Sequence, residues 1–454
     1  MKKIYLLLLL QFFCFPSNAQ CWQTVYNGSQ ESLIIRTDGT LWGMGSNFNG
    51  ELGTGNNAPI YIPIQIGNDN HWKSIATGYD HTTAIKTDGT LWTWGANHFG
   101  QLGDGFLSDR LSPAQIGNDT NWETVASGLY YNVAVKTDGT LWAWGKNNTS
   151  QLGDGTTTNK IIPTQIGTAT NWKSLSLIDQ FVLALKTDNT LWSWGNNDYG
   201  QLGSGDYLDQ TVPFQIGNDT WKEINAAVYH SMAIRSDNTL WTWGYNDNGQ
   251  LGNGNTNSAL VPTQIGTASD WRSVSGGWKH SAAVKTNNTI WCWGNNEYGE
   301  LGDGTFDNKL TPTQVGTDNE WQSVSVSSYY CTLAIKTNNE LFGWGTNNYG
   351  QLGIGDTAFY NSNPIQVICT DLAVAEIDSQ KVFKIYPNPT TEFLQIVSNK
   401  TNLDKIEVVD LTGKIMISQS TNLNLINVKD LENGLYILKL FSDKNSTKIK
   451  FIKE

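Results

Sequence analysis

The fold of this chain is decided by one recurring stretch, which reads WTWGANHFGQLGDG at residues 92–105. Its first tryptophan, or the residue in its place, recurs at intervals of 49 to 51 residues. The seven positions are Trp42, Trp92, Trp142, Trp192, Trp241, Trp291 and Phe342. Seven units in register predict a repeat architecture, in which each unit buries its apolar face against its neighbours.

Each unit is predicted to form short β-strands. Residues 72–76, 82–86 and 90–94 are apolar or β-branched runs bounded by Gly, Pro, Asn and Asp, and residues 62–66 supply a fourth run. A pair such as Asp88-Gly89 separates two of these runs in every unit, and such residues tolerate the positive φ of a tight hairpin. About four strands per unit predict an all-β fold, a seven-bladed β-propeller over residues 20–369.

The motif identifies the family, because several propeller families share this period. The recurring elements are Trp-x-x-[Val/Ile/Leu], Gly-x-x-His as at Gly78 to His81, Ala-[Ile/Val/Leu]-Lys, Trp-x-Trp-Gly and Gly-Gln-Leu-Gly-x-Gly. Together they resemble the regulator of chromosome condensation repeat family from Trp22 to about Val367. The resemblance implies the same seven-bladed ring.

Residues 1–19 have the features of a secretory signal peptide. Lys2 and Lys3 precede an apolar stretch at residues 4–15, and small residues follow it. The stretch is too short to span a membrane, and no second apolar stretch of spanning length follows. A lipoprotein signal with Cys21 as the acylated residue is the alternative, which Gln20 disfavours because such a signal has a small residue there.

The repeat stops after Cys369, and a polar linker at residues 370–381 leads to a tail without tryptophan. The tail contains Lys384 to Pro389, Asp410 to Lys414 and Gly434 to Tyr436, which resemble the C-terminal sorting domain of the bacterial type IX secretion system. Alternating segments predict a small β-sandwich at residues 382–454. The resemblance implies recognition by the type IX machinery, removal of the tail after export, and a mature protein that is secreted or lies on the outer-membrane surface. An ordinary accessory β-domain is the alternative.

Charge and the scarcity of catalytic motifs restrict the function. The net charge is −12 at pH 7, which repels phosphate backbones, so no nucleic-acid partner is expected. His81, His230 and His280 share one repeat position with other residue types, so we interpret them as packing or hydrogen-bonding groups within the blade. The residues aligned with them are Tyr131, Phe181, Tyr330 and Glu31. No metal-ligand spacing and no nucleophile with a base are visible, and turn chemistry explains the Asp- and Asn-rich loops better than Ca²⁺ does. We expect no cofactor and no catalytic residues.

Nineteen of the 20 tryptophans fall at repeat positions, where they are predicted to form the core between blades. Binding should depend on loops that differ between units, either the long loops before each Pro-x-Gln or the short loops around the histidine position. The short loops are unusually aromatic for turns, and one from each blade would form a ring on one face. The predicted binding residues are Tyr79, Asp80, Tyr130, Tyr131, Tyr229, Trp278, Lys279, Tyr329 and Tyr330. The residues aligned with His81, Tyr131 and Tyr330, could instead replace it inside the blade.

The sequence therefore predicts an exported, non-enzymatic binding module for an extracellular protein or, less favoured, a glycan. The rival hypothesis is a secreted hydrolase or lyase that uses carboxylates on the propeller face. Cys21 and Cys369 flank the first and last blades, so a disulfide between them is predicted to close the ring in an oxidising exterior. Cys292 and Cys331 are expected to be unpaired.

Overall fold

The computed structural model describes residues 22–355, 360–367, 383–386, 390–398, 403–410, 414–421, 423–442 and 445–453. The chain divides into two compact units, Met1–Cys369 and Thr370–Glu454. The expected signal peptide, the linker at 370–381, Cys21 and Cys369 lie outside the described residues. Within the described part, no helix has the length and apolar character needed to cross a membrane.

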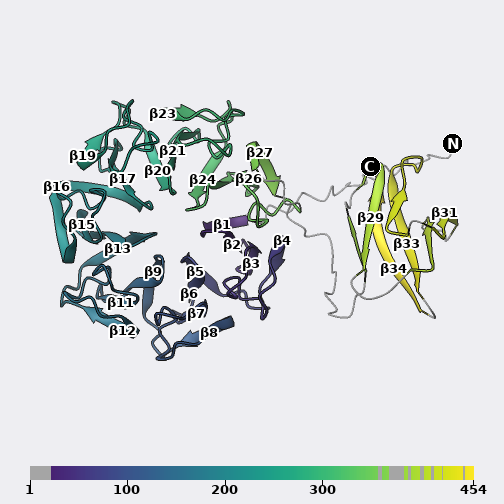
Figure 1. Cartoon of the computed structure of the whole chain (residues 1–454), viewed down its shortest axis with the longest axis horizontal. Helices are drawn as coiled ribbons and strands as arrows, with labels where there is room; N and C mark the ends of the chain where they lie inside the picture. Colours follow the sequence, from purple (N-terminus) through teal and green to yellow (C-terminus); the bar gives the residue numbers. More distant parts are fainter. Residues whose placement is uncertain are drawn as a thin grey trace, which may run out of the picture. The chain divides into compact units, whose positions relative to one another are not determined.

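The first unit is a ring of seven antiparallel four-stranded sheets arranged radially around a central axis (Figure 1). The first blade consists of β1 (Trp22–Asn27), β2 (Glu31–Arg36), β3 (Leu41–Gly45) and β4 (Ile60–Gln65). The second consists of β5 (Trp72–Thr77), β6 (His81–Lys86), β7 (Leu91–Gly95) and β8 (Arg110–Ile116). The third consists of β9 (Trp122–Ser127), β10 (Tyr131–Lys136), β11 (Leu141–Gly145) and β12 (Lys160–Ile166). The fourth and fifth blades share the long strand β16 (Gln210–Ala226). The other strands of the fourth blade are β13 (Trp172–Leu177), β14 (Phe181–Lys186) and β15 (Thr190–Gly195). Those of the fifth blade are β17 (His230–Arg235), β18 (Leu240–Gly244) and β19 (Ala259–Gln264). The last two consist of β20 (Trp271–Gly276), β21 (His280–Lys285), β22 (Ile290–Gly294) and β23 (Lys309–Gln314), and β24 (Trp321–Val326), β25 (Cys331–Lys336), β26 (Leu341–Thr346) and β27 (Tyr360–Val367). The predicted seven-bladed propeller is confirmed.

The predicted hairpin turns lie between the second and third strands of the blades. Gly39 has a φ of 80°, and Asn189, which stands at the same point of the fourth blade, has a φ of 66°. Asp38 tightens its turn by accepting hydrogen bonds from the backbone N–H and the hydroxyl of Thr40, at 3.0 and 2.6 Å. Because these turns lie on one face of the ring, the C-terminal ends of the first and third strands lie together on the other face.

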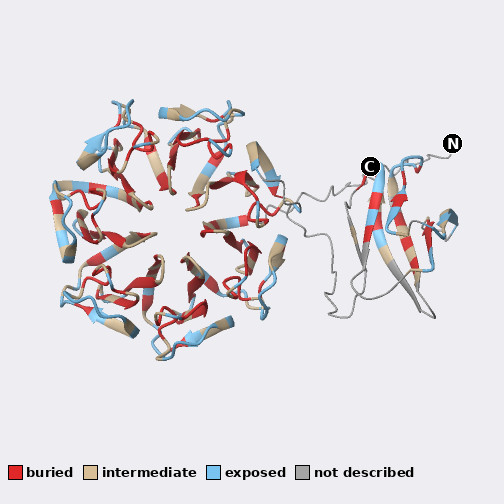
Figure 2. Cartoon of the chain, viewed as in Figure 1, coloured by how far each residue is buried: buried red, intermediate tan, exposed pale blue. Residues whose placement is uncertain are grey.

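The second tryptophan of each Trp-x-Trp pair joins neighbouring blades. Trp94 is fully buried, and its indole N–H donates to the carbonyl of Glu51 in the preceding blade at 2.8 Å. The first tryptophan lies in a different environment, because Trp92 is only half-buried and Lys86 Nζ lies 3.4 Å from its ring centroid. The core between blades was therefore correctly predicted for the second tryptophan, whereas the first packs against that core while half-buried and also takes part in a cation–π contact. Figure 2 shows the buried residues within and between the blades and the more exposed outermost strands.

The second unit has two sheets around one apolar core. One sheet has the order β28 (Phe383–Tyr386), β29 (Phe393–Ser398) and β32 (Leu425–Asn427), and the other has β31 (Ile415–Gln419), β30 (Lys405–Val409), β33 (Gly434–Ser442) and β34 (Asn445–Lys453). Leu394, Ile406 and Leu438, from both sheets, are completely buried in one cluster. This arrangement is the small β-domain predicted for the tail.

Candidate functional site

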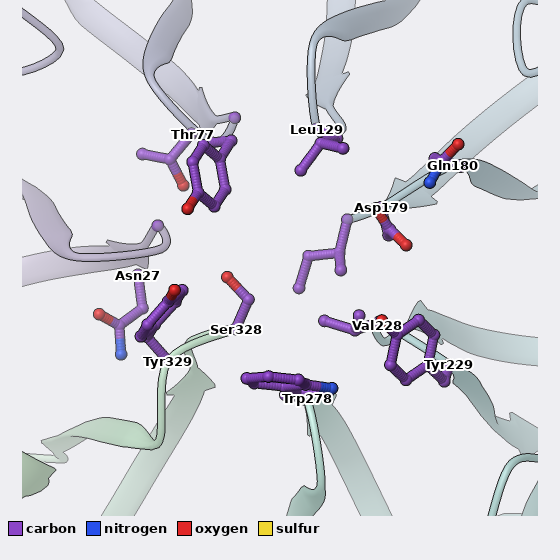
Figure 3. A pocket seen from close by; sticks show the side chains of 14 residues that line it. Asn27, Thr77, Leu129, Asp179, Gln180, Val228, Tyr229, Trp278, Ser328 and Tyr329 are labelled. Carbon is purple, nitrogen blue, oxygen red and sulfur yellow. The ribbon is translucent and has the colours of Figure 1, made fainter. Parts of the chain in front are cut away.

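Seven loops meet on one face of the ring, and together they surround a hollow of about 300 Å³ (Figure 3). Each loop joins the first strand of a blade to its second strand, and every blade contributes to the wall. The lining residues are Asn27, Gly28, Thr77, Gly78, Tyr79, Leu129, Ile178, Asp179, Gln180, Val228, Tyr229, Trp278, Ser328 and Tyr329.

Hydrogen bonds between neighbouring loops hold this wall in place. The backbone N–H of Tyr79 donates to the carbonyl of Leu129 at 3.3 Å, and the N–H of Leu129 donates to the carbonyl of Asp179 at 3.0 Å. The N–H of Val228 likewise donates to the carbonyl of Gly277 at 3.1 Å. Because each bond joins two blades, the hollow is preformed, which lowers the entropic cost of binding a ligand there.

The two sides of the hollow differ in chemistry. Asn27, Thr77 and the hydroxyl-bearing ring of Tyr329 lie on one side, whereas Leu129 and Val228 lie on the other, with Asp179 and Gln180 between them (Figure 3). A ligand that enters the hollow therefore meets neutral hydrogen-bonding groups on one side, and apolar side chains with a carboxylate and an amide between them on the other.

Three aromatic clusters surround the hollow, and the blade 2–3 cluster consists of Tyr79, Phe99 and Tyr130. The ring centroids of Tyr79 and Tyr130 are 5.9 Å apart, and those of Phe99 and Tyr130 are 5.1 Å apart. Lys146 Nζ lies 5.1 Å from the Phe99 centroid and 5.4 Å from that of Tyr130. This cluster has a resident cation.

The blade 6–7 cluster consists of Trp278, Tyr298, Tyr329 and Tyr330. Trp278 and Tyr330 are stacked, with centroids 5.4 Å apart, and Tyr298 lies 5.0 Å from Tyr330. Lys279 Nζ lies 5.2 Å from the Trp278 centroid. This cluster, too, has its own cation.

The blade 4–5 cluster consists of Tyr199, Tyr229 and Tyr245, which are all in mutual contact. The centroid distances are 4.6 Å for Tyr199 and Tyr229, 5.1 Å for Tyr199 and Tyr245, and 6.0 Å for Tyr229 and Tyr245. Carboxylates adjoin it, because the Tyr245 hydroxyl donates to Asp247 Oδ2 at 2.8 Å and Asp179 lines the hollow beside Tyr229 (Figure 3).

Most of the predicted binding residues belong to these clusters. Tyr79, Tyr130, Tyr229, Trp278, Tyr329 and Tyr330 are half-buried members, and Asp80 and Lys279 are half-buried neighbours on the same loops. Tyr131 is an exception. It is completely buried and its hydroxyl donates to the carbonyl of Phe181 at 2.8 Å, so it belongs to the blade interior and not to the face.

The alignment of Tyr330 with His81 was wrong. Cys331 pairs with Gly345 as His81 pairs with Gly95, so Cys331 occupies the histidine position in the seventh blade. The loop there is one residue longer, and Tyr330 absorbs the extra residue with a φ of 54°. Tyr330 therefore remains in the loop, where it stacks on Trp278.

Four cluster members were not among the predicted site residues. Phe99, Tyr199 and Tyr298 precede the glycine of Gly-Gln-Leu-Gly or Gly-Glu-Leu-Gly, and Tyr245 follows the Trp-Gly pair. Their loops follow the third strand, whose end lies beside the end of the first strand. The signal available in the sequence was the recurrence of an aromatic residue at the position before that glycine.

Carboxylates on this face are held in partly desolvated positions. Burial raises the pKa of Asp179 to about 6, against a hydrogen bond from Gln180 and the charge of Lys146. Burial also raises the pKa of Asp80 to about 6, and the nearby charge of Glu51 raises it further. The rival hydrolase hypothesis needs a second carboxylate in the hollow, whereas Asp179 is the one carboxylate among the described residues that line it.

The three histidines of the repeat position bond to the next blade. His81 Nε2 lies 3.0 Å from Asn132 Oδ1, His230 Nε2 lies 2.8 Å from Ser281 Oγ, and all three histidines are completely buried. Burial lowers their pKa, to about 4 for His81 and about 3 for His230. The predicted packing and hydrogen-bonding role is confirmed, but the prediction that the bonds lie within the blade was wrong, because they cross to the next blade. Among the described residues, no group of three or more His, Cys, Asp or Glu side chains is placed to hold a metal ion.

Comparison with solved structures shows the same fold in eukaryotic proteins. Prp20p from Saccharomyces cerevisiae has a TM-score of 0.66 at 21% identity, over 81% of this chain and 90% of that chain. Yeast RCC1 (Prp20) bound to Kap60 also has a TM-score of 0.66, at 20% identity over 84% and 93% of the two chains. Human WBSCR16 has a TM-score of 0.61 at 21% identity, over 67% and 84%. Comparison with the curated proteins gives no match.

Family comparisons cover both units. Residues 384–454 match the secretion system C-terminal sorting domain, which implies handling by type IX secretion and a destination outside the cell or on the outer-membrane surface. Regulator of chromosome condensation (RCC1) repeats match residues 271–300 and 321–351, and a second description of the repeat matches 287–334 and 338–378. The RCC1-like domain matches residues 13–275, more than half of the chain. With seven blades of this repeat in one ring, the chain belongs to the RCC1-like domain family.

Proposed function

We propose that this exported propeller is a non-enzymatic binding module that captures an extracellular protein on the face around the hollow. The observation that carries the proposal is the preformed hollow with three aromatic clusters around it. Aromatic side chains supply most of the energy of many protein interfaces, because they bury a large area and lose little rotamer freedom. The scaffold supports this use, since every wall loop is anchored to rigid strands.

A protein partner fits the site better than the alternatives. The clusters extend the aromatic surface beyond the hollow, so that a projecting segment of a protein could enter the hollow while its flanks contact the clusters. A glycan remains the second candidate, because sugars also stack on tyrosine and tryptophan. The sorting domain would serve export alone, and we propose that it is removed afterwards. The intact mass of the extracellular protein tests that removal.

The test is capture by the full-length protein from the extracellular and cell-surface fractions of its host. The variant Tyr130→Ala/Tyr229→Ala/Trp278→Ala should retain less than about a tenth of the captured partner, because each lost anchor costs about 1–2 kcal/mol. A matched control is Tyr61→Ala/Tyr207→Ala, which removes exposed tyrosines of the outer part of the blades. Equal capture by the wild-type protein and the face variant would contradict the proposal, and binding to a glycan array without protein capture would favour the glycan.

A further inference from the structure

The three aromatic clusters differ in the charge that lies beside them. Lys146 lies over the blade 2–3 cluster, and Lys279 lies over the blade 6–7 cluster. Among the cation–π contacts of the described residues, none involves Tyr199, Tyr229 or Tyr245. Two clusters thus show that this face accommodates a cation against its rings, and the third has the rings without one.

Two acidic groups adjoin the blade 4–5 cluster. Asp247 accepts the hydrogen bond of the Tyr245 hydroxyl at 2.8 Å, which increases the electron density of that ring. Asp179 lines the hollow next to Tyr229, and its charge raises the pKa of the Tyr229 hydroxyl after burial, the larger cause. The positive charge of Lys146 lowers the pKa of Asp179, but the ion pairs of the described residues do not include one between these two side chains. An electron-rich cluster next to a partly desolvated carboxylate attracts a cation from two directions.

We infer that the blade 4–5 cluster together with Asp179 receives a Lys or Arg side chain from the protein partner. The inference rests on the proposed function and names the chemistry that the partner must present. The apolar stem of such a side chain can lie against Val228 and Leu129, which line the same hollow, while its charged head reaches the tyrosines and Asp179. The net charge of −12 favours the approach of a basic segment as well.

The test uses short peptides that isolate the charge. The probes are acetyl-Gly-Lys-Gly-amide and acetyl-Gly-Arg-Gly-amide, and the matched uncharged probe contains norleucine in place of Lys. Titration of the full-length protein by NMR or calorimetry should show that the charged probes bind at least about 5-fold more tightly than the norleucine probe. Tyr229→Leu and Asp179→Asn should each weaken the binding of the charged probes about 3-fold or more.

Tyr61→Leu is the matched control, because it removes an exposed tyrosine from the outermost strand of a blade, outside the lining of the hollow. It should leave the binding of the charged probes unchanged, and thermal unfolding checks that all variants are folded. Norleucine binding as tight as Lys, no detectable binding of either charged probe, or equal losses in Tyr61→Leu and Tyr229→Leu would each overturn the inference.

A pH profile separates the role of Asp179 from that of packing. The groups around Asp179 are Gln180, Lys146, Tyr131 and Tyr229, and burial holds its pKa at about 6. Binding of the Lys probe should therefore weaken as the pH falls from 7 to 5, and Asp179→Asn should abolish most of this change. If Asp179→Asn had the same pH profile as the wild-type protein, the contact with Asp179 would be contradicted.

If the peptides fail to bind while partner capture still depends on the face residues, the inference falls and the proposed function stands. If capture ignores the face residues, the proposed function itself falls.

Discussion

One repeat position, the first residue of the second strand in each blade, faces the next blade and tolerates several residue types. His230 and His280 bond to Ser281 and Thr332 of the following blade at 2.8 and 3.0 Å. Phe181 fills the same place in the fourth blade without a polar group and is completely buried. The position therefore requires buried volume, and a hydrogen bond across the interface is an addition that only some blades have.

The buried histidines make the propeller sensitive to acid. The folded-state pKa of His230 is about 3, below the 6.5 of an exposed histidine, because burial penalises the charged form. The unfolded chain consequently binds a proton that the folded chain excludes, so this stability is complete above pH 6.5 and is lost as the pH falls toward 3. Between pH 7 and pH 5 the unfolding free energy should fall in both proteins. We expect the fall to be about 2 kcal/mol smaller in His230→Phe than in the wild-type protein, measured by urea denaturation.

The replacement leaves little else to change, because Ser281 Oγ keeps its hydrogen bond to the carbonyl of Gln250 at 2.8 Å. Buried carboxylates such as Glu223, with a pKa raised by burial to about 7, act in the opposite direction, but they are common to both proteins and cancel in the comparison. The control is His71→Phe, in which the histidine side chain is exposed. Parallel pH dependences for His230→Phe and the wild-type protein would show that the imidazole is not the acid-sensitive group.

Residue-level interpretation from the sequence succeeded where the repeat has constant length. His81, His230 and His280 share their position because each lies nine residues after a tryptophan, and the structure confirms their role. The same reasoning misplaced Tyr330, because an insertion of one residue is absorbed by a left-handed backbone conformation that the sequence does not reveal. Tyr131 could not be assigned from sequence either, since a tyrosine suits both a blade interior and a binding face.

At the scale of the element, the asparagine of Trp-Gly-x-Asn organises the loop between the third and fourth strands. Asn197 is completely buried, and its Oδ1 accepts the backbone N–H of Leu202 at 2.9 Å. Its Nδ2 donates to the carbonyls of Asp206 and Leu208 at 3.0 and 3.2 Å. One side chain thus replaces the backbone pairing that this loop lacks, and the equivalent asparagines make the same contact to leucine in the other blades.

Asn197→Ala should destabilise the propeller by about 1–3 kcal/mol, because it leaves buried backbone groups without partners. Asn197→Asp should also destabilise it, since a carboxylate can accept the Leu202 N–H but cannot donate to the two carbonyls. Chemical denaturation measures both effects. The exposed Asn68→Ala is the control and should change stability by less than about 0.5 kcal/mol. If Asn197→Ala behaved like Asn68→Ala, the loop would not depend on this side chain.

Strands and turns could be predicted because their signals are local. The predicted run at residues 82–86 lies in β6 and that at 405–409 coincides with β30, since β-branched residues and flanking Asp or Gly mark them. The grouping of Phe99, Tyr199 and Tyr298 with the short loops was missed, because two loops far apart in a unit meet only when the sheet has formed. The site residues on the loops between the first and second strands could therefore be predicted from the sequence. Those on the loops after the third strand could not.

At the scale of the whole molecule, the seam between the last and first blades differs from the other interfaces. In six blades the second tryptophan donates its indole N–H to a backbone carbonyl of the preceding blade. Met44 stands at this position in the first blade and has no N–H to donate, so the carbonyl of Gln351 accepts the Ser32 hydroxyl at 3.0 Å without an indole beside it. The equivalent carbonyl of Glu51 accepts both the Thr82 hydroxyl, at 2.7 Å, and the Trp94 indole N–H. Seven blades were predictable from the period, whereas this difference at closure follows from how the first unit meets the seventh in space.

The predicted disulfide between Cys21 and Cys369 would reinforce this seam. Trp22, which follows Cys21, and Val367, which lies two residues before Cys369, belong to one buried cluster, as Trp72 and Ile66 do at the next interface. The first and last strands of the propeller, β1 and β27, thus contribute to the same cluster at the seam. A cross-link there would enclose almost the entire ring in one covalent loop. The double variant Cys21→Ser/Cys369→Ser should lower the unfolding free energy by about 2–5 kcal/mol.

Alkylation before and after reduction, read by mass spectrometry, checks the bond directly. Without reductant, Cys21 and Cys369 should resist alkylation even in denaturant, whereas the buried free thiols of Cys292 and Cys331 should react once the chain unfolds. Reductant should lower the melting temperature of the wild-type protein but not that of the double variant, because the variant has no bond to break. Cys292→Ala keeps the pair intact and should retain the full response to reductant. Alkylation of both Cys21 and Cys369 in the unreduced protein would mean that packing and the Ser32 hydrogen bond close the ring without a covalent link.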